Sequence, residues 1–164
     1  MNFITPILLL TASLTAQPDE VVVLKVGRAI TVSGKDIEKA VIVMENGRIK
    51  AVGTDVEIPR TARVVDMPRA VAMPGIVDAH SVNGLRISNE RFSNVPYVTV
   101  LDGIDPSSPG LSNALRHGVT SVHCIAGNVT RFGGQGAVIR TSGKTVAELV
   151  VKTPSAMKLS LQPA

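Results

Sequence analysis

The residue with the clearest potential for metal chemistry is His80, which ends the apolar segment Ile76–Ala79. Side chains alternate along a strand, so a second ligand two residues later would reach the same cation. That position holds Val82, whose side chain has no lone pair and cannot coordinate a metal. This segment of the sequence therefore offers one candidate metal ligand, His80.

Other reactive side chains favour structural roles. His117 precedes Gly118 at an expected helix end, where a partial positive charge suits the helix dipole. His123 lies in an expected strand, and a hydrogen-bonded core histidine is favoured there over a ligand. Cys124, the single cysteine, lies in an apolar run and indicates a buried, inert thiol. Asp78 could act as a general base, but its strand context favours a structural role, so no catalytic residue is assigned.

A glycine-rich segment, Gly133–Gly136, raises the question of phosphate binding. Backbone N–H groups in such a loop can surround an anion. No Lys-Ser or Lys-Thr pair stands where a Walker motif needs one. We therefore expect a structural turn there and no nucleotide site.

Several segments together resemble a known family, over a span from about Val21 to the C-terminus. They have the family's hairpin, strand-end and glycine patterns and are Val41–Gly53, Pro74–Val82, Gly118–Val122, Gly133–Ile139 and Gly143–Lys152. The sequence resembles the N-terminal portion of the amidohydrolase superfamily, and within it the imidazolonepropionase-related branch. In that family the strand usually ends in His-x-His, so Val82 stands where the second histidine is expected.

The resemblance implies a metal-dependent hydrolase that acts on non-peptide carbon–nitrogen bonds, built on a TIM barrel and using a divalent metal such as zinc. The family's other ligands come from later strands: a lysine or glutamate, two histidines and an aspartate. Because His80 alone cannot hold a divalent ion tightly, we expect this chain to bind no metal and to be inactive by itself. The alternative is a non-catalytic binding or scaffold protein that has lost the metal site. Val82 favours the alternative, and the motifs favour the hydrolase. The substrate-binding residues are unknown.

The expected fold class is α/β with an all-β part. Residues 17–73 are expected to form an amidohydrolase-type β-sandwich segment, with a type I′ turn at Asn46-Gly47 and a further strand at Val56–Pro59. Residues 74–164 are expected to form an incomplete start of a (β/α)8 barrel.

That barrel start is expected to contain two parallel strands, Ile76–Ala79 and Val119–Ile125, and one crossover helix between them. The helix could begin at Asp105-Pro106 or at Ser108-Pro109. Two more helices are expected, one after Thr145 and one over Ser155–Leu161. Two strands leave open edges, so a partner chain or an oligomer is expected to supply the rest of the barrel.

Composition narrows the remaining possibilities. The chain has 164 residues, 45% of them hydrophobic, and a net charge of +4 whose basic residues are scattered singly. No nucleic-acid partner is therefore expected. Residues 1–16 contain the short apolar run Phe3–Leu10, which predicts a secretory signal peptide and an exported protein. The alternatives are a leader that is not a signal, or a partial gene start. No segment is long enough for a membrane span.

Overall fold

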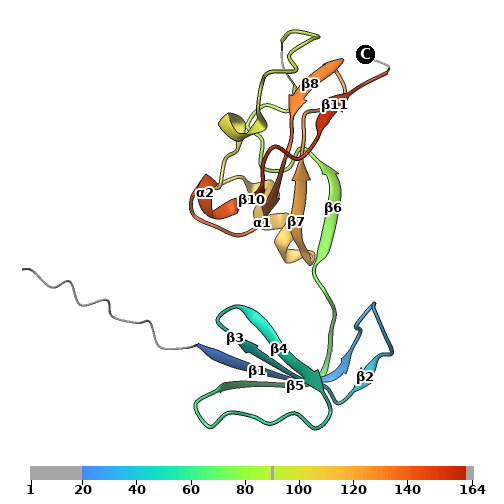
Figure 1. Ribbon diagram of the computed structural model, residues 1–164, viewed down its shortest axis with the longest axis vertical. Coiled ribbons are helices and arrows are strands. Elements are labelled where there is room, and N and C mark those ends of the chain that lie inside the picture. The colour runs from blue at the N-terminus through green and yellow to red at the C-terminus, as the bar shows by residue number, and fades with distance from the viewer. Residues whose placement is uncertain (1–19, 90, 162–164) are drawn as a thin grey trace, which may run out of the picture. The chain divides into compact units, whose positions relative to one another are not determined.

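The computed structural model describes residues 20–89 and 91–161 (Figure 1). The chain divides between Pro74 and Gly75 into two compact units. The expected signal peptide over residues 1–16 lies outside the described residues. Within the described part, no helix is long and apolar enough to cross a membrane.

The first unit is a five-stranded sheet centred on its N-terminal strand, β1. Strand β1 pairs antiparallel with β2 and β3, and parallel with β5. Strand β4 extends the sheet beyond β3. The strands are β1 (Val21–Ala29), β2 (Ile37–Glu38), β3 (Val41–Glu45), β4 (Arg48–Gly53) and β5 (Arg63–Ala72). Where a β-sandwich segment was expected, the described residues of this unit form one sheet.

The hairpin between β3 and β4 has the predicted turn. Asn46 and Gly47 both have positive φ, 51° and 73°, as a type I′ turn requires. The expected strand at Val56–Pro59 is wrong, because this segment is irregular. Pro59 has no backbone N–H to donate to a strand ladder, which weakens any pairing there.

Small apolar side chains form the core of the first unit. Val26, Ala29, Ala40 and Ile42 are buried, with partly buried neighbours from β1, β3 and β5 around them. Val26 and Ala29 are three positions apart on β1, and the pairing of β1 with β5 shifts register between Val26 and Arg28.

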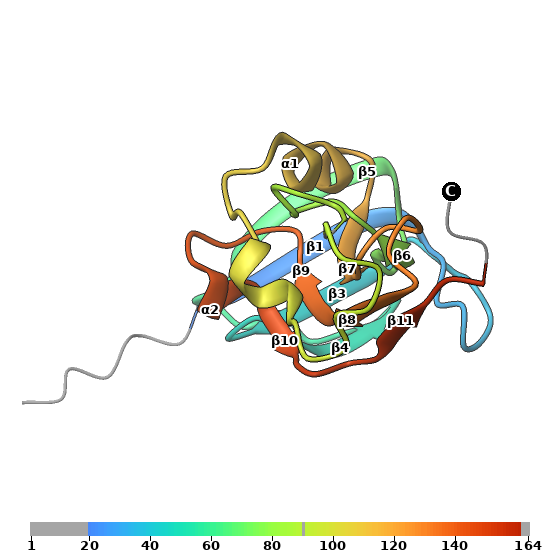
Figure 2. The ribbon, with the colours of Figure 1, turned by 90° about the horizontal axis from the view of Figure 1, so that it is seen from above.

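The second unit combines a four-stranded sheet, in the order β10-β9-β7-β6, with a two-stranded sheet of β8 and β11 (Figures 1 and 2). Only β6 and β7 pair in parallel within the first of these sheets. The elements are β6 (Ile76–Ser81), the 3-10 helix η1 (Val100–Gly103), α1 (Pro109–Arg116), β7 (Val119–Cys124), β8 (Phe132–Gln135), β9 (Ala137–Arg140), α2 (Val146–Leu149), β10 (Val150–Lys152) and β11 (Met157–Leu159).

The expected strand–helix–strand order is present as β6, α1 and β7, and it positions the candidate site. Ser108 caps α1 by accepting a hydrogen bond from the Gly110 N–H, and Pro109 occupies the first turn. Of the two expected starts, the structure uses Ser108-Pro109. The helix ends before Gly118, whose φ of 83° suits glycine.

The expectation of two strands in this unit is wrong, since four more strands follow them. Strand β9 pairs antiparallel along β7, so β7 is a central strand rather than an open edge. The short apolar alternation in Ala137–Arg140 supplies this neighbour. The expected turn at Gly133–Gly136 lies mainly within strand β8.

The expected helix over Ser155–Leu161 is also wrong, because this segment contains strand β11. Two backbone hydrogen bonds explain the difference. Ser155 N–H donates to the carbonyl of Gly136, and Gly136 N–H donates to the carbonyl of Ala156. These long-range bonds hold the segment extended. Helix propensity depends on residue type within the segment and therefore cannot predict them. The expected helix after Thr145 is confirmed as the short helix α2.

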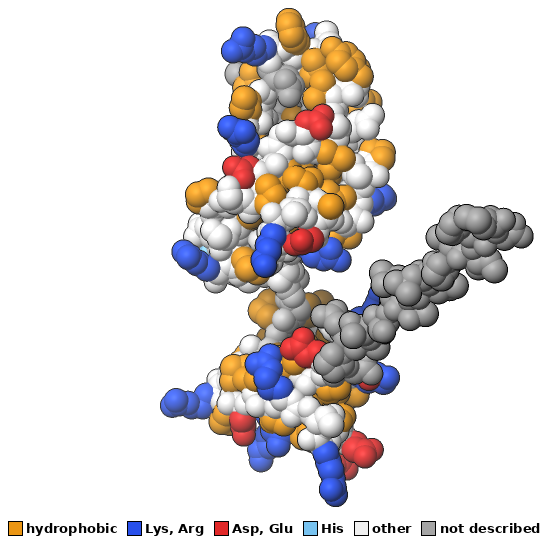
Figure 3. Space-filling view, turned by 90° about the vertical axis from the view of Figure 1, so that its left-hand side faces the viewer, with side chains coloured by type: hydrophobic (Ala, Val, Ile, Leu, Met, Phe, Trp, Pro, Cys, Tyr) orange, Lys and Arg blue, Asp and Glu red, His pale blue; other side chains and the backbone are white. Residues whose placement is uncertain are grey.

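Long aliphatic side chains fill the core of the second unit. Leu111, Val122, Ile139 and Leu149 are at most 1% exposed and pack into one cluster. On the surface, hydrophobic side chains lie interspersed with charged ones (Figure 3). Strand β6 lies at the edge of its sheet and exposes Ile76 and Val77.

Candidate functional site

His80, the candidate metal ligand, lies on β6 next to the end of the strand and contacts a lysine from a distant part of the chain. Its Nε2 lies 2.9 Å from Nζ of Lys158 on β11. Nζ of Lys158 also donates to Oδ1 of Asn128, at 2.6 Å. The fold therefore brings together an imidazole, an ammonium and a carboxamide at the end of β6.

The direction of these hydrogen bonds follows from the chemistry of lysine. An ammonium group has three donors and no acceptor, so Nε2 of His80 must accept. The ring proton of the neutral imidazole is then on Nδ1. The lone pair that would face a metal from Nε2 is directed at Lys158 instead, and the positive charge of Lys158 opposes a cation there.

The remaining residues do not complete a zinc site. Val82 follows β6 directly and offers no ligand atom. Asp78 is engaged locally, since its Oδ1 accepts a hydrogen bond from the backbone N–H of His80. Among the described residues, no group of three or more His, Cys, Asp or Glu side chains could hold a metal ion. Because zinc needs three or four protein ligands, the described residues do not fit the metal that the sequence resemblance implies.

His123 is fully hydrogen-bonded, as the sequence favoured. Its Nδ1 lies 3.0 Å from the carbonyl oxygen of Ala79, and its Nε2 lies 2.8 Å from Oγ of Ser155. Sequence reasoning missed both Ser155 and Lys158, because it placed them in a helix. Alternation in Met157–Leu159 is too short a signal to have corrected that.

Cys124 is buried, as expected. Burial raises the pKa of its thiol from an ordinary value near 9 to about 12. The thiol Sγ lies 3.6 Å from the carbonyl of Asn83, to which it can donate. A thiol that stays protonated is a poor nucleophile. His117 Nδ1 lies 2.9 Å from the carbonyl of Asn113, near the C-terminal end of α1.

The Gly133–Gly136 segment is tightly packed against its neighbours. A Cβ at Gly134, where φ is 80°, would lie 2.4 Å from the carbonyl oxygen of Val98. A Cβ at Gly133 would lie 3.0 Å from that of Ala126. These glycines allow close backbone packing, which accounts for them without a bound phosphate.

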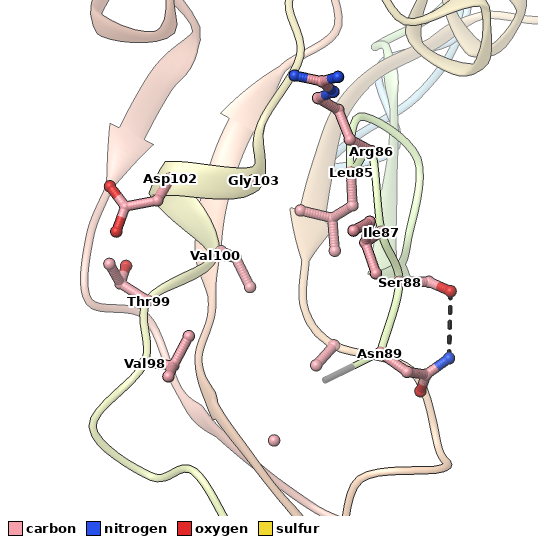
Figure 4. Close-up of a pocket in the computed structure, with 12 residues that line it drawn as sticks. Leu85, Arg86, Ile87, Ser88, Asn89, Val98, Thr99, Val100, Asp102 and Gly103 are labelled. Carbon is pink, nitrogen blue, oxygen red and sulfur yellow. Dashed lines mark hydrogen bonds between the residues drawn. The ribbon is translucent and has the colours of Figure 1, made fainter. Parts of the chain in front are cut away.

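A cavity of about 560 Å³ lies in the second unit, between the loop that follows β6 and the segment around η1 (Figure 4). Leu85 and Val100 point into it from opposite sides, whereas Asp102 points away and Asn89 turns aside to donate to Ser88. The lining of the cavity includes both apolar and polar residues: Leu85, Ile87, Val98, Val100 and Ala126, and Arg86, Ser88, Asn89, Thr99 and Asp102. Neither His80 nor His123 lines it.

No family profile matches the chain, and no curated protein matches it. Among solved structures, the chain is similar to an amidohydrolase from Thermotoga maritima MSB8, with 32% sequence identity and a TM-score of 0.79. This similarity covers 84% of the present chain and 38% of the Thermotoga chain. The chain thus spans well under half of that amidohydrolase.

Two further similarities are weaker. The A. niger ochratoxinase has 24% identity and a TM-score of 0.47, over 69% of this chain and 27% of that one. A prolidase has 24% identity and a TM-score of 0.39, over 62% and 25%. Neither carries an argument of its own. These structural neighbours are members of the amidohydrolase superfamily, and the mostly β structure resembles an amidohydrolase domain.

Proposed function

We propose that this chain is an amidohydrolase-like protein related to hydrolases of non-peptide carbon–nitrogen bonds, and that by itself it holds no catalytic metal and does not hydrolyse amides. One observation carries the second part. Nε2 of His80 accepts a hydrogen bond from Lys158, and Val82 supplies no second ligand. A single imidazole already engaged by an ammonium is a poor start for a zinc site.

The similarity to the Thermotoga amidohydrolase supports the relationship, because it extends over most of this chain at 32% identity. The sequence motifs at Val41–Gly53 and Pro74–Val82 support it independently. The proposal also includes three finer points: membership of the imidazolonepropionase-related branch, the barrel, and the metal dependence of the hydrolysis to which the chain is related. It includes export as well, which rests on the apolar residues 1–16.

Metal-dependent hydrolysis would need ligands that the described residues of this chain do not supply. His80 would have to release Lys158 before Nε2 of its imidazole could serve as a ligand. A partner chain or an oligomer would have to supply the other ligands. The exposed edge of β6, with Ile76 and Val77, is where such a neighbour could pair.

A non-catalytic binding or scaffold role is the second candidate. The cavity of about 560 Å³ favours it, since a pocket of this size can hold a small ligand without catalytic groups. The contact between Lys158 and His80 favours the binding role too, because the ammonium of Lys158 stabilises the end of β6 without a metal ion.

The test is the zinc content of the purified chain after dialysis, measured by elemental mass spectrometry, together with assays on linear and cyclic amides. We expect less than stoichiometric zinc and no hydrolysis, in the wild type and in His80→Ala alike. Stoichiometric zinc that is lost in His80→Ala, or zinc-dependent amide hydrolysis, would reject the inactive-chain proposal. Binding of small apolar molecules without hydrolysis, lost on Val100→Trp in the cavity, would favour the binding role.

A further inference from the structure

Ser155 and His123 form a hydrogen-bonded pair that amidohydrolase-like chemistry does not use. Ser155 precedes β11, His123 lies on β7, and Oγ of Ser155 lies 2.8 Å from Nε2 of His123. We propose that this pair is a nucleophile–base dyad, in which His123 activates Ser155 for metal-independent acyl transfer from activated esters. The dyad goes beyond the function proposed above, since it requires no metal ligand.

The tautomer of a neutral His123 ring follows from its partner at Nδ1. The carbonyl of Ala79 can only accept a hydrogen bond, so Nδ1 of the neutral ring carries the proton. Nε2 is then a lone-pair acceptor, and the hydroxyl of Ser155 donates to it. This is the tautomer that a general base needs when it takes a proton from a serine.

Both members are held by backbone structure. His123 lies on the central strand β7, between β6 and β9. The N–H of Ser155 donates to the carbonyl of Gly136 at 2.9 Å, and the N–H of Gly136 donates to the carbonyl of Ala156 at 2.7 Å. These two backbone hydrogen bonds therefore hold Ser155 beside His123.

Gly136 leaves room for the contact between the two side chains. A Cβ at this position would lie 3.0 Å from Nε2 of His123 and 3.1 Å from Oγ of Ser155. Both distances are tighter than ordinary van der Waals contact, so a side chain there would crowd the pair. Ser155 and His123 are each half-buried, so solvent and small reagents can reach them.

The reaction would proceed in two steps. Oγ of Ser155 attacks the carbonyl carbon of the ester while Nε2 of His123 takes the hydroxyl proton. An Oγ–acyl bond forms, the bond from the acyl carbon to the leaving oxygen breaks, and the leaving oxygen takes the proton from His123. Water then adds to the acyl carbon with His123 as base, and Oγ of Ser155 leaves with the proton.

The orienting group limits the substrate class. The carbonyl of Ala79 fixes the ring but lacks the full negative charge of a carboxylate, so the imidazolium formed during attack is stabilised less. We therefore expect reaction with esters that have good leaving groups, such as aryl esters, and slow turnover.

The experiment treats the full 164-residue chain with an alkyl fluorophosphonate, which forms an Oγ–phosphorus bond as fluoride leaves, and locates the adduct by peptide mass spectrometry. We expect labelling of Ser155 in the folded wild type and its loss in Ser155→Ala. His123→Gln should slow it by about a hundred-fold, the usual contribution of a general base. The matched control Ser142→Ala, at an exposed serine, should be labelled at Ser155 as fast as the wild type.

Folding is checked by circular dichroism, and a second measurement needs no variant. The wild type unfolded in urea should lose the excess reactivity of Ser155, because the dyad exists only in the folded chain. The proposal is overturned if folded wild type is not labelled at Ser155, or if Ser155 and Ser142 react equally. It also fails if folded His123→Gln reacts at the wild-type rate, or if urea leaves the rate of Ser155 unchanged.

Discussion

Nζ of Lys158 lies 2.9 Å from Nε2 of His80, although the two residues are 78 positions apart in the chain. The contact joins β6 to β11, which belong to different sheets of the second unit. It places a fixed positive charge at the histidine nitrogen that would otherwise face a metal. The valine at position 82 and the ammonium of Lys158 therefore both disfavour a metal ion at His80.

Removing this cation should improve zinc binding only where a second ligand is also present. We expect Val82→His to bind zinc weakly, and the double variant Val82→His with Lys158→Met to bind it about ten-fold more tightly, a difference of about 1.4 kcal/mol. Competition with a chromophoric chelator measures both affinities.

Lys144→Met in the Val82→His background is the matched control. The side chain of Lys144 is exposed, and among the described residues no hydrogen bond joins it to His80. It should leave the zinc affinity of Val82→His unchanged. Equal affinities with and without Lys158 would show that its ammonium does not oppose a metal.

Gly27 on β1 should not tolerate a side chain. A Cβ there would lie 2.4 Å from the carbonyl oxygen of Pro68, a backbone atom that cannot rotate away. We expect Gly27→Ala to lower the free energy of unfolding of the first unit by about 1–3 kcal/mol. Hydrogen exchange of β1 and β5 measures the loss. Gly34→Ala is the control, since its Cβ would lie 3.5 Å from Thr31 Oγ1, an ordinary contact. Similar exchange in both variants would contradict the steric explanation.

Short sequence patterns predicted the β3–β4 turn, helix α1 and the strand that carries His80, because adjacent residues determine these features. Asn46-Gly47 predicted its turn because both residues accept positive φ. Gly118 predicted the end of α1, whereas its start was left open between Asp105-Pro106 and Ser108-Pro109. The motif around His80 placed this residue on β6, near the end of the strand. These features depend on a few adjacent residues.

Long-range pairing could not be predicted in the same way. Strand β11 is three residues long and pairs with β8, more than 20 positions earlier, so no periodicity reports it. The helix predicted over Ser155–Leu161 consequently concealed both Ser155 and Lys158. Of the candidate site, the sequence therefore predicted only His80 as a ligand; it favoured a structural role for His123, and it did not predict the partners Lys158 and Ser155.

The stability of the chain should depend on the proton of Cys124 in alkaline solution. Burial raises the pKa of this thiol in the folded state to about 12, above its ordinary value near 9. The folded state then holds the proton more tightly than the unfolded state. This contribution is fully present below the unfolded pKa and is lost as the pH rises toward the folded pKa.

The measurement compares urea denaturation of the wild type with that of Cys124→Ala at several alkaline pH values. Lysine and tyrosine titrate in the same range, and the variant cancels their effect. We expect the stability advantage of the wild type to shrink by roughly 1.4 kcal/mol per pH unit above the unfolded pKa. A constant difference would mean that Cys124 ionises alike in both states.

Ile139 should be the more important of two neighbouring residues on β9. Its side chain is fully buried in the cluster with Val122 and Leu149, whereas that of Val138 is half-buried. Truncating a buried isoleucine removes apolar contacts and leaves a cavity, so Ile139→Ala should cost about 2–5 kcal/mol. Val138→Ala should cost clearly less, because part of its surface already faces solvent.

Both substitutions remove aliphatic carbons from adjacent positions of one strand, which makes them a matched pair. Hydrogen exchange of Val119–Cys124 reads out the effect, since β7 pairs with β9 along its length. In the wild type, these amides should be protected as those of a central strand are, and Ile139→Ala should make them exchange much faster than Val138→Ala does. If β7 exchanges rapidly in the wild type, or if the two variants behave alike, then β9 does not cover β7 as a packed neighbour, and the central position of β7 in this unit is wrong.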